Sequence, residues 1–172
     1  TGGTLHVKDN IIANNQNSGV YLGNKESTGT IADNLFIGNG TAVAGFYQSE
    51  YQVTHNVILD STYAGVGAWD TCRLNVRDNV FQGNAKALVV YAKGSKDTNT
   101  LGRNTFWKNT ADVENCQRAT DSILADPLFQ DPATGDYALR PGPVVEAKQG
   151  LTDPKIIRTL WARWKGREIK GP

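Results

Sequence analysis

The chain has 172 residues, a formal net charge of +1 at pH 7, and 39% hydrophobic and 20% charged residues. Its length suits one domain with a sizeable core, and a charge this close to zero predicts neither a nucleic-acid partner nor a membrane-surface partner. No window is long and apolar enough to span a bilayer, and a chain without methionine looks like a mature or excised piece rather than a full translation product.

A nine-residue phrase recurs from residue 7 onward. It reads apolar, two variable residues, Asn, two mostly apolar residues, two variable residues, and then Asn or a small polar residue, as in Val76–Asn84. Successive lead positions are 24, 22, 23, 25 and 22 residues apart. They are occupied by Asn10, Asn34, Asn56, Asn79 and Asn104, and by Asp126 in a decayed sixth copy.

A nearly constant period in the low twenties is typical of two solenoid folds, the leucine-rich repeat and the parallel β-helix. The leucine ladder of the first is absent, whereas β-branched and aromatic residues bounded by Gly, Asn, Asp and Ser indicate short strands and turns. Stacked coils lie about 4.8 Å apart, so each lead asparagine can donate and accept hydrogen bonds along the stack. The sequence therefore predicts an all-β parallel β-helix solenoid of about five to six coils over residues 1–147.

Strand alternation assigns the apolar residues of each repeat to the interior or to the surface. The phrase predicts two interior columns: Val7, Ile31, Val53, Val76, Leu101 and Ile123, and Ile12, Phe36, Ile58, Phe81, Phe106 and Leu128. A second apolar segment opens at a small residue in each repeat, at Gly19, Gly45, Gly65 and Ala87. Counting from that residue directs Val20, Phe46, Val66 and Leu88 inward and Tyr21, Tyr47, Trp69 and Tyr91 outward.

The two ends of the chain depart from the repeat. The first repeat starts without a cap, so we expect further N-terminal coils or a partner chain to stack on this open end. The tail, residues 148–172, contains an amphipathic helix near residues 154–165, with Asp153 as its N-cap and Gly166 as its stop. Its apolar stripe predicts a lid packed on or beside the solenoid, with a membrane-surface element as the alternative.

Neither cysteines nor short motifs indicate a cofactor. Cys72 and Cys116 fall two coils apart, roughly 9.6 Å along the stack at the strand spacing of a sheet. This separation exceeds the reach of a disulfide, so both thiols are predicted to be unpaired. There is no nucleophile motif, phosphate loop or cysteine–histidine metal spacing, and we expect no cofactor and no metal site.

The repeats and the closing stretch Ala125–Pro143 resemble the right-handed parallel β-helix proteins of the pectate-lyase-like superfamily. The resemblance covers about residues 5–147 and implies a secreted or cell-surface protein that binds or processes polysaccharide. It leaves the activity open, because this fold carries lyases, glycoside hydrolases, adhesins and other proteins. The expectation is part of a larger glycoside hydrolase or polysaccharide lyase, and the alternative is a non-catalytic surface module or a scaffold that docks another chain.

Two sets of outward residues fit a sugar ligand. Tyr21, Tyr47, Trp69 and Tyr91, with Lys93 beside them, would form an aromatic platform for a polysaccharide or oligosaccharide. Glu50 and Asp70 stand at the same distance from Gly45 and Gly65, so they could form the closely spaced carboxyl pair of a retaining glycosidase. The alternative is that both carboxylates lie in solvated turns.

Two further groups of residues suggest other chemistry. A lyase needs a cation to neutralise a uronate carboxylate and a base to remove a proton. Lys93, Lys96 and Arg103 could supply the cation, although solvated lysines are the simpler interpretation. The residues before the lead asparagines form a second row that could act as a base or help to bind a metal, or could simply be an exposed column of turn residues. This row contains Asp9, Asp33, His55, Asp78 and Arg103.

Overall fold

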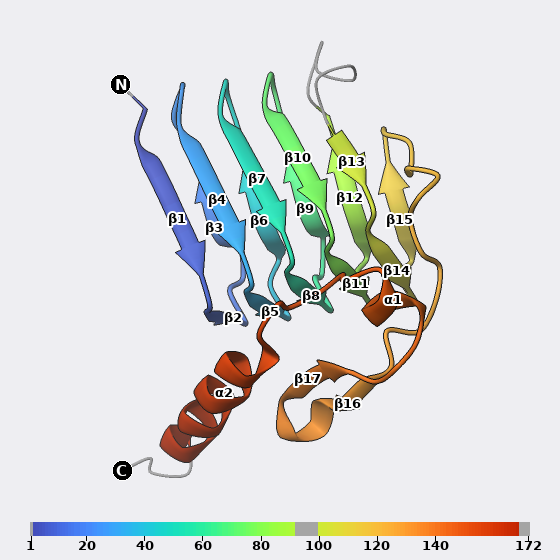
Figure 1. Cartoon of the computed structure of the whole chain (residues 1–172). Helices are drawn as coiled ribbons and strands as arrows, with labels where there is room; N and C mark the ends of the chain where they lie inside the picture. The colour runs from blue at the N-terminus through green and yellow to red at the C-terminus, as the bar shows by residue number, and fades with distance from the viewer. Residues whose placement is uncertain (1, 92–99, 169–172) are drawn as a thin grey trace.

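The computed structural model describes residues 2–91 and 100–168, and in 166–168 the backbone only. Within these ranges, short parallel strands form three five-stranded sheets, and each coil contributes one strand to each sheet (Figure 1). Sheet A contains β1 (Thr4–Lys8), β4 (Thr28–Ala32), β7 (Glu50–Thr54), β10 (Arg73–Arg77) and β13 (Thr100–Gly102). Sheet B contains β2 (Ile11–Ala13), β5 (Leu35–Ile37), β8 (Val57–Leu59), β11 (Val80–Gln82) and β14 (Thr105–Trp107). Sheet C contains β3 (Ser18–Leu22), β6 (Thr41–Gly45), β9 (Ala64–Ala68), β12 (Lys86–Val90) and β15 (Ala111–Glu114).

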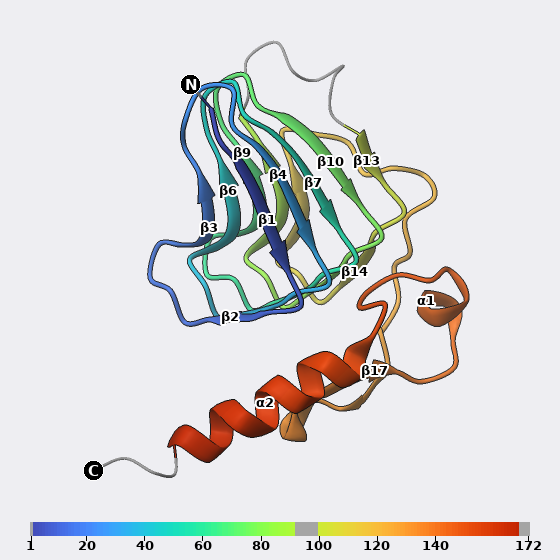
Figure 2. The ribbon, with the colours of Figure 1, turned by 60° about the vertical axis from the view of Figure 1, so that its left-hand side comes forward.

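The three sheets wrap around a common interior, which confirms the predicted all-β parallel β-helix (Figure 2). Ile31, Val53 and Val76 are fully buried in the first predicted column, and Phe36, Ile58 and Phe81 are fully buried in the second. The rings of Phe81 and Phe106 stack with centroids 5.5 Å apart. Alternation along the strands therefore places both predicted columns in the interior over the first five repeats.

The turn from sheet A to sheet B has the same conformation in every coil. Its first residue takes a left-handed backbone with φ between 49° and 60°. These residues are Asp9, Asp33, His55, Asp78 and Arg103. The lead asparagine follows, and its backbone N–H and Nδ2 both donate to Oδ1 of the lead asparagine one coil further on, over 2.9–3.3 Å. This ladder runs from Asn10 to Asn104, as predicted.

The sixth coil predicted from Asp126 does not form. In each coil the residue after the lead position donates its N–H to the lead carbonyl of the preceding coil, and Ile123 makes this bond to Asn104 at 2.9 Å. Ile123 therefore extends sheet B and does not continue the first interior column. Pro127 has no N–H with which to make the same bond after Asp126. Leu128, predicted to be interior, has a left-handed backbone and is only half-buried.

The register of the second apolar segment differs from the prediction in the second coil. Strand β6 places Val43, and not Phe46, in the interior column of sheet C. Gly45 ends this strand instead of opening it, and a Cβ at this position would collide with the buried ring of Tyr51. The glycine thus makes room for the tyrosine inside the solenoid, and Phe46 passes to the outer surface.

The C-terminal tail packs against the outer face of sheet B. Its elements are the hairpin β16 (Phe129–Asp131) and β17 (Asp136–Leu139), the 3-10 turn η1 (Pro132–Thr134), α1 (Pro143–Glu146) and α2 (Pro154–Glu168). Tyr137, Val144 and Ile157 from the tail cover the outward side chains of Leu35 and Val80. This cover explains why neighbouring residues of β5 and β11 are buried on both faces of the sheet.

From α1 the chain runs back across the coils, so that α2 lies below β2 at the opposite end of the solenoid (Figures 1 and 2). The predicted C-terminal helix is confirmed, and it packs beside the coils. It continues beyond Gly166, which does not end it. No helix in the described part of the chain is both long and apolar enough to cross a membrane. The proposed division of the chain near residue 147 stays a prediction.

Candidate functional site

A row of aromatic rings lies on the outer side of sheet C. Phe46, Trp69 and Tyr91 directly follow β6, β9 and β12, and the backbone N–H of each bonds to the end of the strand one coil earlier. The rings of Phe46 and Trp69 are parallel within 8°, with centroids 4.7 Å apart. Tyr91 continues the stack 6.4 Å from Trp69, and Tyr21 extends it 5.2 Å from Phe46 in the other direction.

Two glycines give these rings their positions. Gly23 occupies in the first coil the place that Phe46 occupies in the second, and a Cβ there would overlap the ring of Tyr21. Tyr21 therefore fills this place from inside β3. A Cβ on Gly67 would likewise overlap the ring of Trp69. The rings of Tyr21 and Trp69 thus occupy space that a side chain at these two positions would fill.

The row is an exposed surface and not an extension of the core. Tyr21 and Tyr47 are 56% and 54% exposed, and Tyr63 and Tyr91 are each 42% exposed. Large exposed apolar patches on a soluble domain commonly mark interaction sites. We call this surface the aromatic face, and it consists of Tyr21, Phe46, Tyr47, Tyr63, Trp69 and Tyr91.

A polar group borders the aromatic face at β12 and β15. Lys86 Nζ lies 2.9 Å from a carboxylate oxygen of Glu114 and 4.8 Å from the ring centroid of Tyr63. The hydroxyl of Tyr91 donates a hydrogen bond to the same carboxylate. This bond raises the pKa of Tyr91, and together with Lys86 it lowers the pKa of Glu114. The hydrogen bond from Lys86 to Glu114 in turn raises the pKa of Lys86. The border thus offers a cation, an anion and hydroxyls to a ligand on the rings.

The structure brings together most of the predicted platform. Tyr21, Trp69 and Tyr91 stand in one stack, as the spacing of the repeats suggested. Tyr47 lies beside the stack, 6.5 Å from Phe46 and tilted by 48°. Lys93 and Lys96 lie outside the described residues.

Phe46, Tyr63, Lys86 and Glu114 belong to the site but were not predicted for it. Phe46 was assigned to the interior because Gly45 was counted as the start of its strand. Lys86 and Glu114 lie on the neighbouring strands β12 and β15, but the register pairs Lys86 with Ala111 and Glu114 with Val89. Their contact depends on the reach of two long side chains, so the spacing of the repeats alone would not have identified it.

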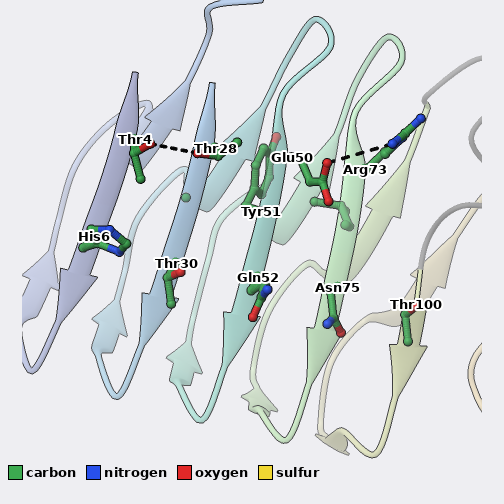
Figure 3. Close-up of a pocket in the computed structure, with 12 residues that line it drawn as sticks. Thr4, His6, Thr28, Thr30, Glu50, Tyr51, Gln52, Arg73, Asn75 and Thr100 are labelled. Carbon is green, nitrogen blue, oxygen red and sulfur yellow. Dashed lines mark hydrogen bonds and ion pairs between the residues drawn. The ribbon is translucent and has the colours of Figure 1, made fainter. Parts of the chain in front are cut away.

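The expected alignment of Glu50 with Asp70 is wrong. Gly45 pairs with Ala68, so Asp70 stands at the position equivalent to Tyr47, whose N–H donates to Asp70 Oδ2 at 3.2 Å. Glu50 begins β7 in sheet A, where its carboxylate lies 4.0 Å from Arg73 (Figure 3). Asp70 therefore lies in a turn after β9 of sheet C, whereas Glu50 lies in sheet A. Their catalytic role stays a prediction, but the alignment that suggested it does not occur.

The turn row that contains His55 forms a partly buried ion pair. Asp78 is 1% exposed, and Arg103 Nε and Nη2 lie 2.8 and 2.7 Å from its Oδ1. His55 Nε2 lies 3.9 Å from Asp78 Oδ2. Asp33 is engaged by the C-terminal tail through Thr152. The guanidinium that a lyase would need is thus already paired with a carboxylate.

Both cysteines are unpaired, as predicted. The buried Cys72 thiol contacts the carbonyl oxygens of Trp69 and Tyr47 at 2.7 and 3.1 Å. Burial raises the pKa of the half-buried Cys116. In the part of the chain that the structure describes, no three His, Cys, Asp or Glu side chains are grouped as metal ligands would be.

The coils, the asparagine ladder and the aromatic face together define a parallel β-helix protein of the pectate-lyase-like type. Comparison with known families then specifies the group. Residues 2–131 match the family described as periplasmic copper-binding protein (NosD), and the chain belongs to this family. The description places the family in the periplasm, which agrees with the predicted location outside the cytoplasm. Searches of curated proteins and of solved structures found no match.

Proposed function

We propose that the protein is an extracytoplasmic carbohydrate-binding module that holds a polysaccharide on the aromatic face without cleaving it. The observation that carries the proposal is the row of adjoining aromatic rings along sheet C, in which Phe46, Trp69 and Tyr91 are stacked and the tyrosines are exposed. Sugar rings pack their apolar C–H surfaces against aromatic side chains, and their hydroxyls need polar partners at the border. Such partners are present in Lys86, Glu114 and the hydroxyl of Tyr91.

The geometry of the stack supports one orientation of a bound glycan. Phe46 and Trp69 are in face-to-face contact, so the ligand meets their outer edges. The tyrosines are the more exposed members, and their hydroxyls can reach a polymer that runs along the row. A chain parallel to the solenoid axis would thus contact one ring in each successive coil.

Binding is favoured over turnover by the positions of the two predicted catalytic carboxylates. Glu50 lies in sheet A beside Arg73, and Asp70 accepts a hydrogen bond from the backbone N–H of Tyr47 in the preceding coil. A retaining glycosidase needs two carboxyl groups about 5–5.5 Å apart on one ligand. The alternative, a hydrolase or lyase, would need its catalytic pair to be assembled elsewhere.

Copper is the ligand named in the family description, and the residues present do not fit it well. Copper(I) prefers cysteine and methionine sulfur, and imidazole suits copper in general. The chain has two cysteines, two histidines and no methionine. Cys72 is buried with its thiol on backbone carbonyls. His6 lies on β1, and His55 lies in the turn after β7, two strands away in sheet A. The aromatic face therefore supports the proposed function better than copper binding does.

A glycan array followed by calorimetry tests the proposal. We expect binding to at least one polysaccharide and a loss of about tenfold or more in affinity for Trp69→Ala. Trp107→Ala removes a tryptophan from sheet B and is the matched control, which should bind as the parent does. Product analysis of each bound glycan should show no cleavage, and equilibrium dialysis should show no stoichiometric copper. Equal binding by both variants, or glycan cleavage, would overturn the proposal.

A further inference from the structure

A second concave surface lies on the outer face of sheet A, around the solenoid from the aromatic face. It is a groove of about 570 Å³ that spans all five strands of the sheet. Residues between the outward positions, such as Tyr51 and Leu74, point into the core. The outward side chains therefore line the groove in two rows, which Figure 3 shows on one face of the sheet.

The longer row consists of five polar side chains in register. The paired residues are His6, Thr30, Gln52, Asn75 and Thr100, one from each strand. Neighbouring strands lie about 4.8 Å apart, so this row extends over roughly 19 Å across the sheet. It presents hydroxyl, amide and imidazole groups, which can donate and accept hydrogen bonds. The one tyrosine among the described lining residues, Tyr51, has its ring in the core and not on the face of the groove.

One atom in this row has no hydrogen-bond partner among the described residues. Oδ1 of Asn75 is buried and accepts no hydrogen bond. Buried acceptors are normally satisfied, because leaving one unpaired is unfavourable. Asn75 lies between Gln52 and Thr100 in the row, and a rotation of its side chain would expose this acceptor to a ligand hydroxyl in the groove.

The shorter row determines the charge that the groove accepts. Thr4 and Thr28 share a hydroxyl–hydroxyl hydrogen bond of 3.1 Å, and Glu50 faces Arg73 over 4.0 Å. The side chains of this ion pair are 62% and 64% exposed. Their opposite charges compensate each other, so neither an acidic nor a basic ligand is favoured over a neutral one.

We propose that this groove is a second binding site, for a neutral, linear oligosaccharide that lies across the strands of sheet A. The repeat of polar groups at the strand spacing suits a polymer with a hydroxyl-bearing unit at regular intervals. Recognition here depends on hydrogen bonds, whereas the aromatic face depends on ring contacts. The two sites face different directions, so one molecule could hold two glycan chains.

The test uses the full chain and soluble hexasaccharides of glucose, xylose and mannose, with a hexagalacturonate as the charged comparison. Calorimetry of Trp69→Ala isolates the groove from the aromatic face. We expect a neutral hexasaccharide to bind this variant, and the addition of Gln52→Ala and Asn75→Ala to lower its affinity by at least about tenfold. Hexagalacturonate should bind more weakly than the neutral probe.

The outcomes separate this proposal from the function assigned to the aromatic face. If Trp69→Ala binds no neutral hexasaccharide, the groove proposal is wrong, whatever the parent protein binds. Equal affinity with and without the sheet A substitutions, or a preference for hexagalacturonate, would also overturn it. Gln52 is exposed, so Gln52→Ala alone keeps the fold and provides a second variant if the combination is unstable. Its affinity should fall in the same direction.

Discussion

Thr152 donates two hydrogen bonds to a single oxygen of Asp33, 119 residues earlier in the chain: its hydroxyl at 2.6 Å and its backbone N–H at 2.9 Å. Two neighbouring bonds extend this attachment. The N–H of Gly150 donates to the carbonyl of Asp78 at 2.8 Å. The hydroxyl of Thr105 donates to Oε1 of Gln149 at 2.6 Å. Residues 149–152 are thus tied to the fifth, fourth and second coils.

Replacing Asp33 tests how strongly the tail is held. Asp33 is 6% exposed, and hydrogen bonds to a charged group contribute about 1.5–3 kcal/mol. We expect Asp33→Ala to lower the free energy of unfolding by about 2–4 kcal/mol, because alanine also disfavours the left-handed backbone at this position. Asp33→Asn keeps an acceptor and tolerates that backbone, so its free energy of unfolding should fall less. Chemical denaturation measures the stability of both variants, and an Asp33→Ala variant as stable as the parent would refute the attachment of the tail.

The asparagine ladder should be far more sensitive in its middle than at its end. The side chain of Asn56 accepts from Asn34 and donates to two carbonyl oxygens, and it is fully buried. Asn56→Ala leaves several buried groups unpaired and should cost about 3 kcal/mol or more. Asn10 is exposed at the end of the ladder, so Asn10→Ala should cost about 1 kcal/mol or less. Thermal or denaturant unfolding that shows equal losses would contradict this account.

Alkaline pH should weaken the packing of the tail through Tyr137. Burial raises the pKa of Tyr137 from 10.0 to about 12. The pKa of Tyr137 is higher in the folded than in the unfolded protein. Burial of its neutral phenol therefore stabilises the fold fully below pH 10, and this stabilisation is lost as the pH rises through about 12. The stability of Tyr137→Phe should therefore fall less steeply over this interval than that of the parent. Tryptophan fluorescence reports on it, since Trp161 lies 5.8 Å from Tyr137, and identical pH profiles would exclude this role.

A methyl group on Gly67 should displace the ring of Trp69 without opening the core. The Cβ of Gly67→Ala would overlap this ring on the outer side of β9. We expect a shift in tryptophan fluorescence and weaker glycan binding, with a small change in stability. Gly3→Ala is the matched control because no atom lies within 4 Å of its added Cβ. Unchanged glycan affinity in Gly67→Ala would argue against a role for Trp69.

Acid should disturb the border of the aromatic face through Glu114. Its pKa is lowered from the ordinary value of 4.5 by the hydrogen bond from Tyr91 and by Lys86. Because the pKa of Glu114 is lower in the folded protein, its ionised carboxylate stabilises the fold above pH 4.5. This stabilisation is lost as the pH falls through the pKa of Glu114 in the folded protein. Glycan affinity should decline over that acidic range in the parent. Glu114→Gln should bind more weakly at neutral pH and show a flatter profile.

The repeating part of this fold could be predicted from sequence because one local rule recurs in it. Each lead asparagine carries its own donor and acceptor, so its spacing alone reveals the stack. The site was harder to predict, since Gly45 looks like the glycines that open other segments. Its role is to leave space for Tyr51, six residues later, and only the packed interior shows this. Asp126 was misleading in a similar way, because the missing N–H of Pro127 matters only once the coil must bond to its neighbour.

The route of residues 149–152 has a consequence for how the molecule comes apart. In an unattached solenoid each repeat is stabilised by its immediate neighbours, and the ends can fray independently of the centre. Here residues 149–152 contact several coils, so unfolding one coil also breaks contacts that stabilise distant coils. The solenoid should consequently unfold as one cooperative unit, and a chain that ends before Gln149 should unfold gradually, beginning with the terminal coils.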